Sequence, residues 1–455
     1  MKVHRSQSVR RVRVTTDGEG LVSHAGTGLL AEMADRSGLT EAMSVAMASC
    51  GIRWHTHDPG VVLTHMAVAI ADGADCLSHL AVLRNQSELF GPVASQATAW
   101  RAVQAVASVE LRAIPLARAA ARARVWAAGG SPVTVTLDFD ATLVNSYSDK
   151  QDAAPTYKKG FGFHPLGVWC DETNEALAAM LRPGNAGANT ATDHITMLDA
   201  AIAQLPADWQ AGHRPGDDAA GVIHPILARA DSAGATHGFV DALVERNIGY
   251  SIGFDVDGRV RNALMLAQEE DWVPAVEADG SRRPGAWVIE LSDLVDLGTW
   301  PQGARLICRR ERPHPGAQLS LFDIGEGFRH TCFITDSAGE TTALELRQRG
   351  HARVEDRIRA AKACGLRNFP FTDFVSNQAW LTMVLMAQDL LAWTAMVCLD
   401  GAMAKAEPAT LRYRLLHVAA RLARRGRDLH LRIDENWPWA AQLDAAFGRL
   451  RAALG

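Results

Sequence analysis

Three acidic residues lie where the chain could bring carboxylates together. Asp140 ends the β-branched run PVTVTLDFD, and Asp231 ends the apolar run HPILARAD, just before an expected helix. Ligand sites in α/β sheets gather at such strand ends. Glu355 belongs to an expected helix, VEDRIRAAKACG, whose Arg359 and Lys362 share its face. We expect the three carboxylates to converge, although each alone also has a plainer explanation: a solvated strand end, a helix cap or a surface salt-bridge ladder.

Three carboxylates from two strands and a helix suit a pair of metal ions. They can hold two Mg²⁺ ions about 4 Å apart, and such ions stabilise the attacking and leaving oxygens of a displacement at phosphorus. Mg²⁺ prefers carboxylate oxygens together with water and substrate phosphate, and we expect Mn²⁺ to substitute for it. Asp138 is a rival to Asp140 as the first acid, because residues i and i+2 of a strand point to the same face.

A phosphodiester substrate also requires basic residues near the metal ions. The net charge is −5, so the chain has no overall positive field, and contact with nucleic acid must depend on local charge. Basic residues flank the acids in sequence: Lys158, Lys159, Arg349, Arg353, Arg359 and Lys362. The region 405–432 adds Arg412, Arg414, Arg421, Arg424, Arg425, Arg427 and Arg432.

A further basic residue, Arg101, lies in the segment FGPVASQATAWRAVQAV at 90–106. This segment is interpreted as a turn followed by a helix capped by Ser95 or Thr98. It is either the second helix of a helix-turn-helix, with Arg101 facing DNA, or a capped surface helix.

The surrounding pattern predicts an α/β protein with helical flanks. Apolar residues recur at helical spacing in 25–50 and 58–85, and 108–128 is an Ala- and Arg-rich helix. Strand-like runs then alternate with helices, which indicates an α/β layer. The predicted divisions are 1–130, a helical DNA-binding region with a basic N-terminal arm; 131–256 and 342–400, the two parts of the α/β core; 257–341, a β-rich insertion; and 401–455, a basic helical tail.

Cysteine spacing and hydropathy exclude several classes of protein. The seven cysteines include no C-x-x-C pair, which disfavours a zinc knuckle or a disulfide framework and favours buried thiols in a reducing compartment. The basic N-terminus has no apolar core behind it and is therefore no secretory signal. Gln388 and Asp389 interrupt the longest apolar stretch, 379–399, leaving runs shorter than the ~20 residues that a bilayer requires. We expect a buried helix there, no membrane contact and a cytoplasmic location.

The order of these motifs resembles a known family. A strand with D-x-T, then R-A-D-S, then a late helix with R and E-x6-K is similar to the DDE transposases of bacterial insertion sequences, above all to the insertion-sequence family numbered thirteen-eighty. The resemblance extends over nearly the whole chain, including LFGPVASQATAWR, PTYKKGFGFHPLGVW, LRPGNAGANT and WPWAAQL. It implies a ribonuclease-H-like catalytic core with a β-rich insertion, flanked by N-terminal and C-terminal helical regions.

The resemblance also implies an activity and its residues. Asp140, Asp231 and Glu355 take the three DDE positions, for Mg²⁺-dependent cleavage of DNA at element ends and transfer of the freed 3′-hydroxyl to target DNA. The implied partners are terminal inverted repeats, target DNA and a second copy of the chain on the bacterial nucleoid. An insertion-domain tryptophan, Trp272 or Trp287, would stack on a flipped base, with a core position as the alternative for each.

The chain departs from the Y-R-E-K signature of the wider group at two points. Leu346 stands where a tyrosine is expected, and five residues separate Arg349 from Glu355, so that Arg349 and Arg353 both remain candidates for the arginine. Lys362 keeps the expected spacing from Glu355.

Two other functions fit part of the pattern. DFDATLV also matches the D-x-D-x-T motif of haloacid-dehalogenase-like phosphatases, in which Asp138 would be the nucleophile and Asp140 the acid and base. That motif normally opens its domain, whereas about 130 residues precede it here. A catalytically inactive DNA-binding derivative is the other alternative, and the presence of all three acids argues against it.

Overall fold

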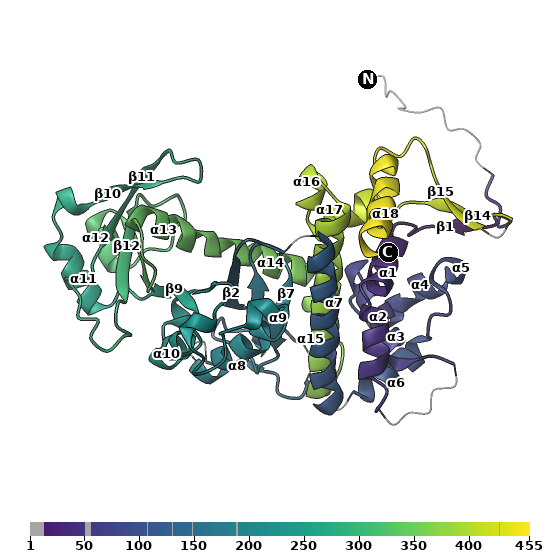
Figure 1. The fold of residues 1–455 in the computed structure, drawn as a ribbon, viewed down its shortest axis with the longest axis horizontal. Coiled ribbons are helices and arrows are strands. Elements are labelled where there is room, and N and C mark those ends of the chain that lie inside the picture. The colour runs from purple at the N-terminus through teal and green to yellow at the C-terminus, as the bar shows by residue number, and fades with distance from the viewer. Residues whose placement is uncertain are drawn as a thin grey trace, which may run out of the picture.

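The computed structural model describes residues 13–50, 56–106, 108–129, 131–147, 149–187, 190–426 and 428–455. A large mixed sheet lies at one side of the molecule and a helical bundle at the other, with helices α7 (Ser108–Gly129) and α15 (Phe374–Cys398) between them (Figure 1). The predicted α/β class is confirmed at this level. Arg427 and the basic residues before Arg13 lie outside the described residues.

Nine described strands form the large sheet, in the order β10-β11-β12-β13-β9-β8-β2-β6-β7. Strands β2, β8 and β9 are parallel to one another, and the remaining neighbours pair antiparallel. The bounds are β2 Val135–Ala141, β6 Leu166–Cys170, β7 Ala176–Met180, β8 Ile226–Ala230, β9 Gly249–Phe254, β10 Val273–Val276, β11 Arg282–Glu290, β12 Arg305–Glu311 and β13 Arg329–Thr335. Because β13 pairs with β9, the strands of the predicted insertion continue the core sheet.

Strand β2 lies inside this sheet, between β6 and β8. Its first five residues are buried, including Leu137 and Phe139, as expected for a strand covered on both faces. Helix α8 (Ala191–Ile202) packs against β6 and β7, and against α10 (His237–Glu245). Helix α14 (Val354–Ala361) contacts β2 and α15. The center of the sheet is thus fixed by helices that are distant in sequence.

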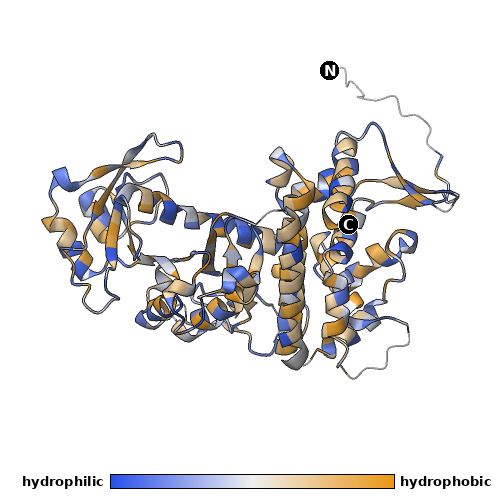
Figure 2. Ribbon diagram, viewed as in Figure 1, coloured by the Kyte–Doolittle hydropathy of each residue, from blue (hydrophilic) through white to orange (hydrophobic). Residues whose placement is uncertain are grey.

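The helical bundle is built around α15. Its 25 residues make it long and apolar enough to cross a membrane (Figure 2). Within the protein, however, 83% of its apolar window is buried. The prediction of a buried helix is confirmed. Around it pack α1 (Thr27–Arg36), α3 (Pro59–Ala71), α6 (Gln96–Gln104), α7 and α18 (Ala440–Leu454), while α2 (Leu39–Ala46) lies against α3 and α7.

Short elements complete the fold. The helices are α4 (Ala81–Arg84), α5 (Ser87–Phe90), α9 (Ala207–Gln210), α11 (Gly258–Leu266), α12 (Leu321–Glu326), α13 (Thr341–Arg349), α16 (Gly401–Ala404) and α17 (Pro408–Leu411). A small sheet has the order β3-β5-β4, with β3 Val144–Asn145, β4 Ala154–Pro155 and β5 Phe161–Phe163.

The predicted helical tail at 401–455 does contain α16, α17 and α18, but it also contains strands that the prediction missed. A hairpin of β14 (Ala420–Arg425) and β15 (Asp428–Ile433) lies between α17 and α18, and β14 pairs with β1 (Leu21–Val22). Alanine and arginine favour helices, which explains the error. The strands instead follow a period of two, with Leu422 facing Leu431 on the inner side. Gly426, at a φ of 65°, supplies the left-handed backbone of the turn.

Candidate active site

Asp140 and Asp231 end adjacent parallel strands. The last registered pair of β2 and β8 is Phe139 opposite Ala230, so the two aspartates follow at the same edge of the sheet. The Asp140 Oδ1 accepts a hydrogen bond from its neighbouring Ala141 N at 2.7 Å. Asp231 caps the short helix after it, accepting from Ala233 N at 3.0 Å. Both carboxylates therefore have backbone donors that hold them at this edge.

Glu355 reaches the same region from α14, the helix that contacts β2. The pKa of Asp140 is raised to about 6, mainly by burial and also by the like charges of Asp231 and Glu355, against the opposing effect of His351. Asp231 and Glu355 therefore both lie within electrostatic range of Asp140, although the ligand atoms of the three acids do not form a group within 4.8 Å of one another. Among the described residues, none of the three forms an ion pair with a basic side chain. Such an uncompensated group of oxygens fits divalent cations.

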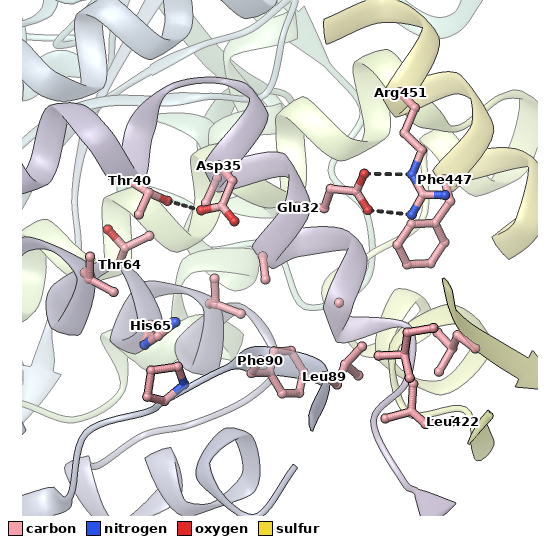
Figure 3. Close-up of a pocket in the computed structure, with 18 of the residues that line it drawn as sticks. Glu32, Asp35, Thr40, Thr64, His65, Leu89, Phe90, Leu422, Phe447 and Arg451 are labelled. Atoms are coloured by element: carbon pink, nitrogen blue, oxygen red, sulfur yellow. Dashed lines mark hydrogen bonds and ion pairs between the residues drawn. The ribbon is translucent and has the colours of Figure 1, made fainter. Parts of the chain in front are cut away.

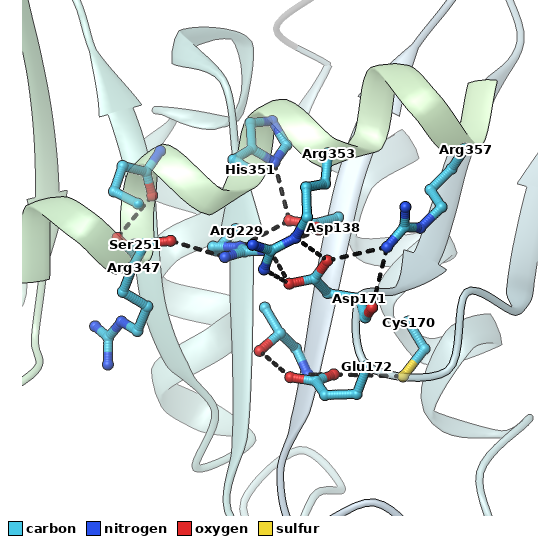
Figure 4. Close-up of polar contacts among 12 residues, drawn as sticks. Asp138, Cys170, Asp171, Glu172, Arg229, Ser251, Arg347, His351, Arg353 and Arg357 are labelled. Atoms are coloured by element: carbon cyan, nitrogen blue, oxygen red, sulfur yellow. Dashed lines mark hydrogen bonds and ion pairs between the residues drawn. The ribbon is translucent and has the colours of Figure 1, made fainter. Parts of the chain in front are cut away.

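Asp138 is committed to a different set of contacts (Figure 4). Its side chain is 2% exposed, and its two oxygens accept from Arg229 Nε at 2.8 Å and Arg229 Nη2 at 2.7 Å. His351 Nδ1 donates to the same carboxylate at 2.9 Å. A buried carboxylate paired in this way is poorly suited to act as a nucleophile. This geometry favours Asp140 over Asp138 as the first acid.

Asp171 was not identified from the sequence, yet it connects the sheet to the helix that carries Glu355. It follows β6 and accepts from Arg229 Nη2 at 2.8 Å, Arg353 Nε at 2.8 Å and Arg357 Nη2 at 3.3 Å (Figure 4). Arg353 and the nearby Arg229 hold the pKa of Asp171 below its usual value despite burial. No local motif marks this residue, because its partners are distant in sequence.

The basic residues expected to bind phosphate divide into two groups. Arg349 pairs with Glu277 and Glu345, and Arg359 pairs with Asp356 and Glu407. These two and Arg353 are engaged within the protein. By contrast, Lys158, Lys159 and Lys362 form no ion pair with any residue that the structure describes.

Lys362 lies within electrostatic range of Asp140, and Lys158 lies within range of Lys362. Burial lowers the pKa of Lys362; Arg367 and Lys158 lower it further by repulsion, whereas Asp140 raises it. Lys158 and Lys159 are exposed on the turn between β4 and β5, and Lys159 has a φ of 62°. This turn therefore extends a basic surface beside Asp140.

The two tryptophans considered for base stacking surround an arginine. The Arg310 guanidinium lies 4.3 Å from the Trp272 ring centroid and 5.3 Å from that of Trp287. Phe328 adds a third ring at 5.0 Å, and Glu269 pairs with the same arginine. Trp272 therefore takes the core position that is its alternative, whereas Trp287 is half-buried against the core, and base stacking by either ring stays a prediction.

Arg101 is exposed on α6, and of the two predicted caps, Ser95 and Thr98, the N-cap is Ser95. It donates to Thr98 Oγ1 at 3.2 Å and to the carbonyl of Ala97 at 3.2 Å. Its contact with DNA stays a prediction.

A cavity of about 690 Å³ lies away from the three acids (Figure 3). It separates the N-terminal helices from the β14–β15 hairpin and α18, with Leu422, His65 and Phe447 among its lining residues. Arg451 closes one side by pairing with Glu32 at 2.8 and 2.9 Å. The cavity therefore belongs to the packing beneath the hairpin.

Comparison with known proteins identifies the family. The family model described as "Transposase DDE domain group 1" matches residues 4–454. No curated protein matches the chain. Among solved structures, a cryo-EM structure of a piggyBac transposase synaptic complex with hairpin DNA is similar at a TM-score of 0.41, with 10% identity over 84% of this chain and 80% of that one. Because the family match spans nearly the whole chain, this protein belongs to the transposase DDE domain group 1 family.

Proposed function

We propose that this protein is an insertion-sequence transposase that cleaves DNA at the ends of its element and transfers the freed 3′-hydroxyl to target DNA. Asp140, Asp231 and Glu355 are its catalytic acids. The single observation that carries the proposal is the uncompensated acidic cluster at the ends of β2 and β8, faced by α14. Membership in a DDE transposase family supports DNA as the substrate.

The sheet order supports a ribonuclease-H-like core. In β7-β6-β2-β8-β9, the central strand is first in sequence, the two antiparallel strands follow on one side, and the two parallel strands follow on the other. The chain then passes through β10 to β13 before it reaches α14. This is the arrangement expected of such a core with a β-rich insertion before its catalytic helix.

The three acids suit divalent ions, Mg²⁺ or Mn²⁺. When bound, such ions lower the pKa of a water nucleophile and stabilise the leaving 3′-oxygen. Lys362 lies within electrostatic range of Asp140, and Lys158 within range of Lys362, so both can neutralise nonbridging phosphate oxygens. No covalent intermediate is needed, since the nucleophile is first water and then the 3′-hydroxyl.

Asp138 and Asp171 act as positioning residues. They connect β2 and the end of β6 to His351, Arg353 and Arg357, which precede or belong to α14. These contacts hold α14 over β2, and therefore hold Glu355 opposite Asp140. The phosphatase alternative is not favoured, because the nucleophile that it requires is the buried, paired Asp138.

The remaining parts of the proposal follow from two-ended transposition. The DNA partners are the terminal inverted repeats and the target, and two copies of the chain act together on the two ends. The protein works in the bacterial cytoplasm on the nucleoid. The similarity of its motifs to the insertion-sequence family numbered thirteen-eighty supports this assignment.

The test compares two adjacent acids on one helix. Glu355→Gln should lower Mg²⁺-dependent cleavage of a duplex carrying the inverted repeat that flanks the gene by at least about 100-fold. Asp356→Asn is the matched control, because Asp356 is also exposed on α14 but pairs with Arg359. Both variants should bind the duplex and melt like the wild type. Wild-type cleavage by Glu355→Gln, or by Asp231→Asn, would contradict the assignment.

A further inference from the structure

The β14–β15 hairpin has two chemically different faces. Its register places Arg421 opposite Arg432, Ala423 opposite His430, and Arg425 opposite Asp428. Directly opposed residues of an antiparallel pair share a face. The other face carries Leu422 and Leu431, which line the cavity over the helical bundle (Figure 3). The face with Arg421, Arg425 and Arg432 therefore points outward.

The arginines of this outer face have no partner within the described part of the chain. Arg421, Arg425 and Arg432 are exposed, as is Arg424 near the turn, and none of the four forms a hydrogen bond or an ion pair with a described side chain. Other exposed arginines do pair, as Arg451 does with Glu32. Like charges directly opposite one another destabilise a sheet. The Arg421–Arg432 pair is therefore unexplained by folding and suits an external polyanion.

This surface is distinct from the candidate active site. The hairpin projects from the helical bundle on the far side of α7 and α15 from β2 (Figure 1). Basic residues of 405–432 were expected near the metal ions, but Arg421, Arg424, Arg425 and Arg432 lie on this hairpin instead, so the prediction is wrong for these four. Arg412 and Arg414 of the same region turn inward: Arg412 donates to the carbonyl of Ala71 at 2.9 Å, and Arg414 lies 5.0 Å from the Trp439 ring centroid.

We propose that the outer face of β14–β15 binds the sugar–phosphate backbone of duplex DNA, as a second contact separate from the acidic cluster. Arginine presents a planar fork that matches phosphate, and a two-stranded β-ribbon fits the major groove of B-DNA, which is about 12 Å wide. The choice of duplex DNA as the polyanion rests on the proposed function. The contact anchors DNA while the cleavage site lies across the molecule.

The test removes the outer charges without touching the acids. In the triple variant Arg421→Gln, Arg425→Gln and Arg432→Gln, the affinity for duplex DNA should depend less steeply on salt. The magnitude of the slope of log affinity against log salt concentration should decrease by about 2 to 3, since each phosphate contact contributes about 0.9. At about 0.1 M salt the affinity should fall roughly 100-fold. A control triple variant, Arg214→Gln, Arg282→Gln and Arg329→Gln, removes the same charge from exposed sites on the sheet domain. It should bind nearly as the wild type does.

Other measurements separate the possible failures. The hairpin variant should melt no lower than the wild type, because it relieves a like-charge pair, and should cleave at the wild-type rate when DNA is saturating. Unchanged affinity and slope would overturn the proposal, as would an equal loss in the control variant or a loss confined to single-stranded RNA. A wild-type protein that neither binds nor cleaves duplex DNA would instead overturn the proposed function. A wild type that cleaves, paired with a hairpin variant that binds normally, rejects the hairpin contact alone.

Discussion

Asparagine at position 140 should stabilise the metal-free protein. Burial and two neighbouring carboxylates raise the pKa of Asp140 from its ordinary 3.8 to about 6. The charged form is therefore disfavoured in the fold. The penalty is absent below about pH 3.8, grows as the pH rises, and is complete above about pH 6. At 1.36 kcal/mol per pKa unit, it reaches roughly 3 kcal/mol.

Asp140→Asn removes this penalty and preserves the side-chain oxygen that accepts from Ala141. For a chain of 455 residues, an unfolding entropy of about 2.1 cal/mol/K per residue converts ~3 kcal/mol into a rise of about 3 °C in melting temperature. The rise should appear in EDTA at about pH 7.5 and disappear at about pH 4. Adding Mg²⁺ should raise the melting temperature of the wild type more than that of the variant.

Asp138→Asn is the matched control, two residues away on the same strand face. It should lower the stability of the fold, whereas Asp140→Asn should raise it. It leaves the buried Arg229 without its bidentate carboxylate and His351 without its acceptor. Removing one partner of a buried ion pair costs about 3 to 5 kcal/mol. Both variants are compared by thermal and urea unfolding. If Asp140→Asn destabilised the protein, or if its gain did not depend on pH, the reasoning about an uncompensated acidic cluster would be refuted.

Two further substitutions test the scaffold. Gly365→Ala should destabilise the protein by about 1 to 3 kcal/mol, because Gly365 has a φ of 87° and a Cβ there would lie 3.2–3.3 Å from packed side chains. The control Gly448→Ala, at an open position on α18, should be neutral or stabilising. Equal changes in unfolding free energy for the two variants in denaturant titrations would contradict this. His417 Nε2 lies 3.1 Å from Asp72, which raises the pKa of His417 above 6.5. The stabilisation from the His417–Asp72 ion pair is complete below about pH 6.5 and is lost above the folded-state pKa of His417. His417→Gln should therefore lower the melting temperature more at about pH 6 than at about pH 9. A decrease in melting temperature that does not depend on pH would show that the imidazole is not charged.

The strand ends were predictable because their signals are local. The β-branched run before Asp140 and the apolar run before Asp231 form β2 and β8, and parallel neighbours end at one edge. The hairpin at 420–433 was missed because arginine and alanine favour helices, while the alternation of Leu422 and Leu431 spans too few residues to outweigh them.

The ion-pair partners could not be predicted, since they depend on residues far apart in sequence. Arg353 resembles a phosphate ligand in its local sequence, yet it pairs with Asp171, 182 residues away. The buried pairs of Arg118 with Asp389 and Arg122 with Glu175 likewise join α7 to α15 and to the residue that precedes β7. Local sequence shows that a charge is present, and only the fold shows whether it is neutralised.

The different environments of Asp138 and Asp140 follow from strand register. Asp138 lies opposite Arg229 on β8, and both side chains point to one face. One step further along that face, Asp140 lies beside Asp231, so a neutral pair is followed by a doubly negative one. Arg229 cannot also neutralise Asp140 and Asp231, because its guanidinium is already divided between Asp138 and Asp171. The addition of Glu355 from α14 makes the second position more negative still, and a cation bound there would offset a repulsion that His351 reduces only in part.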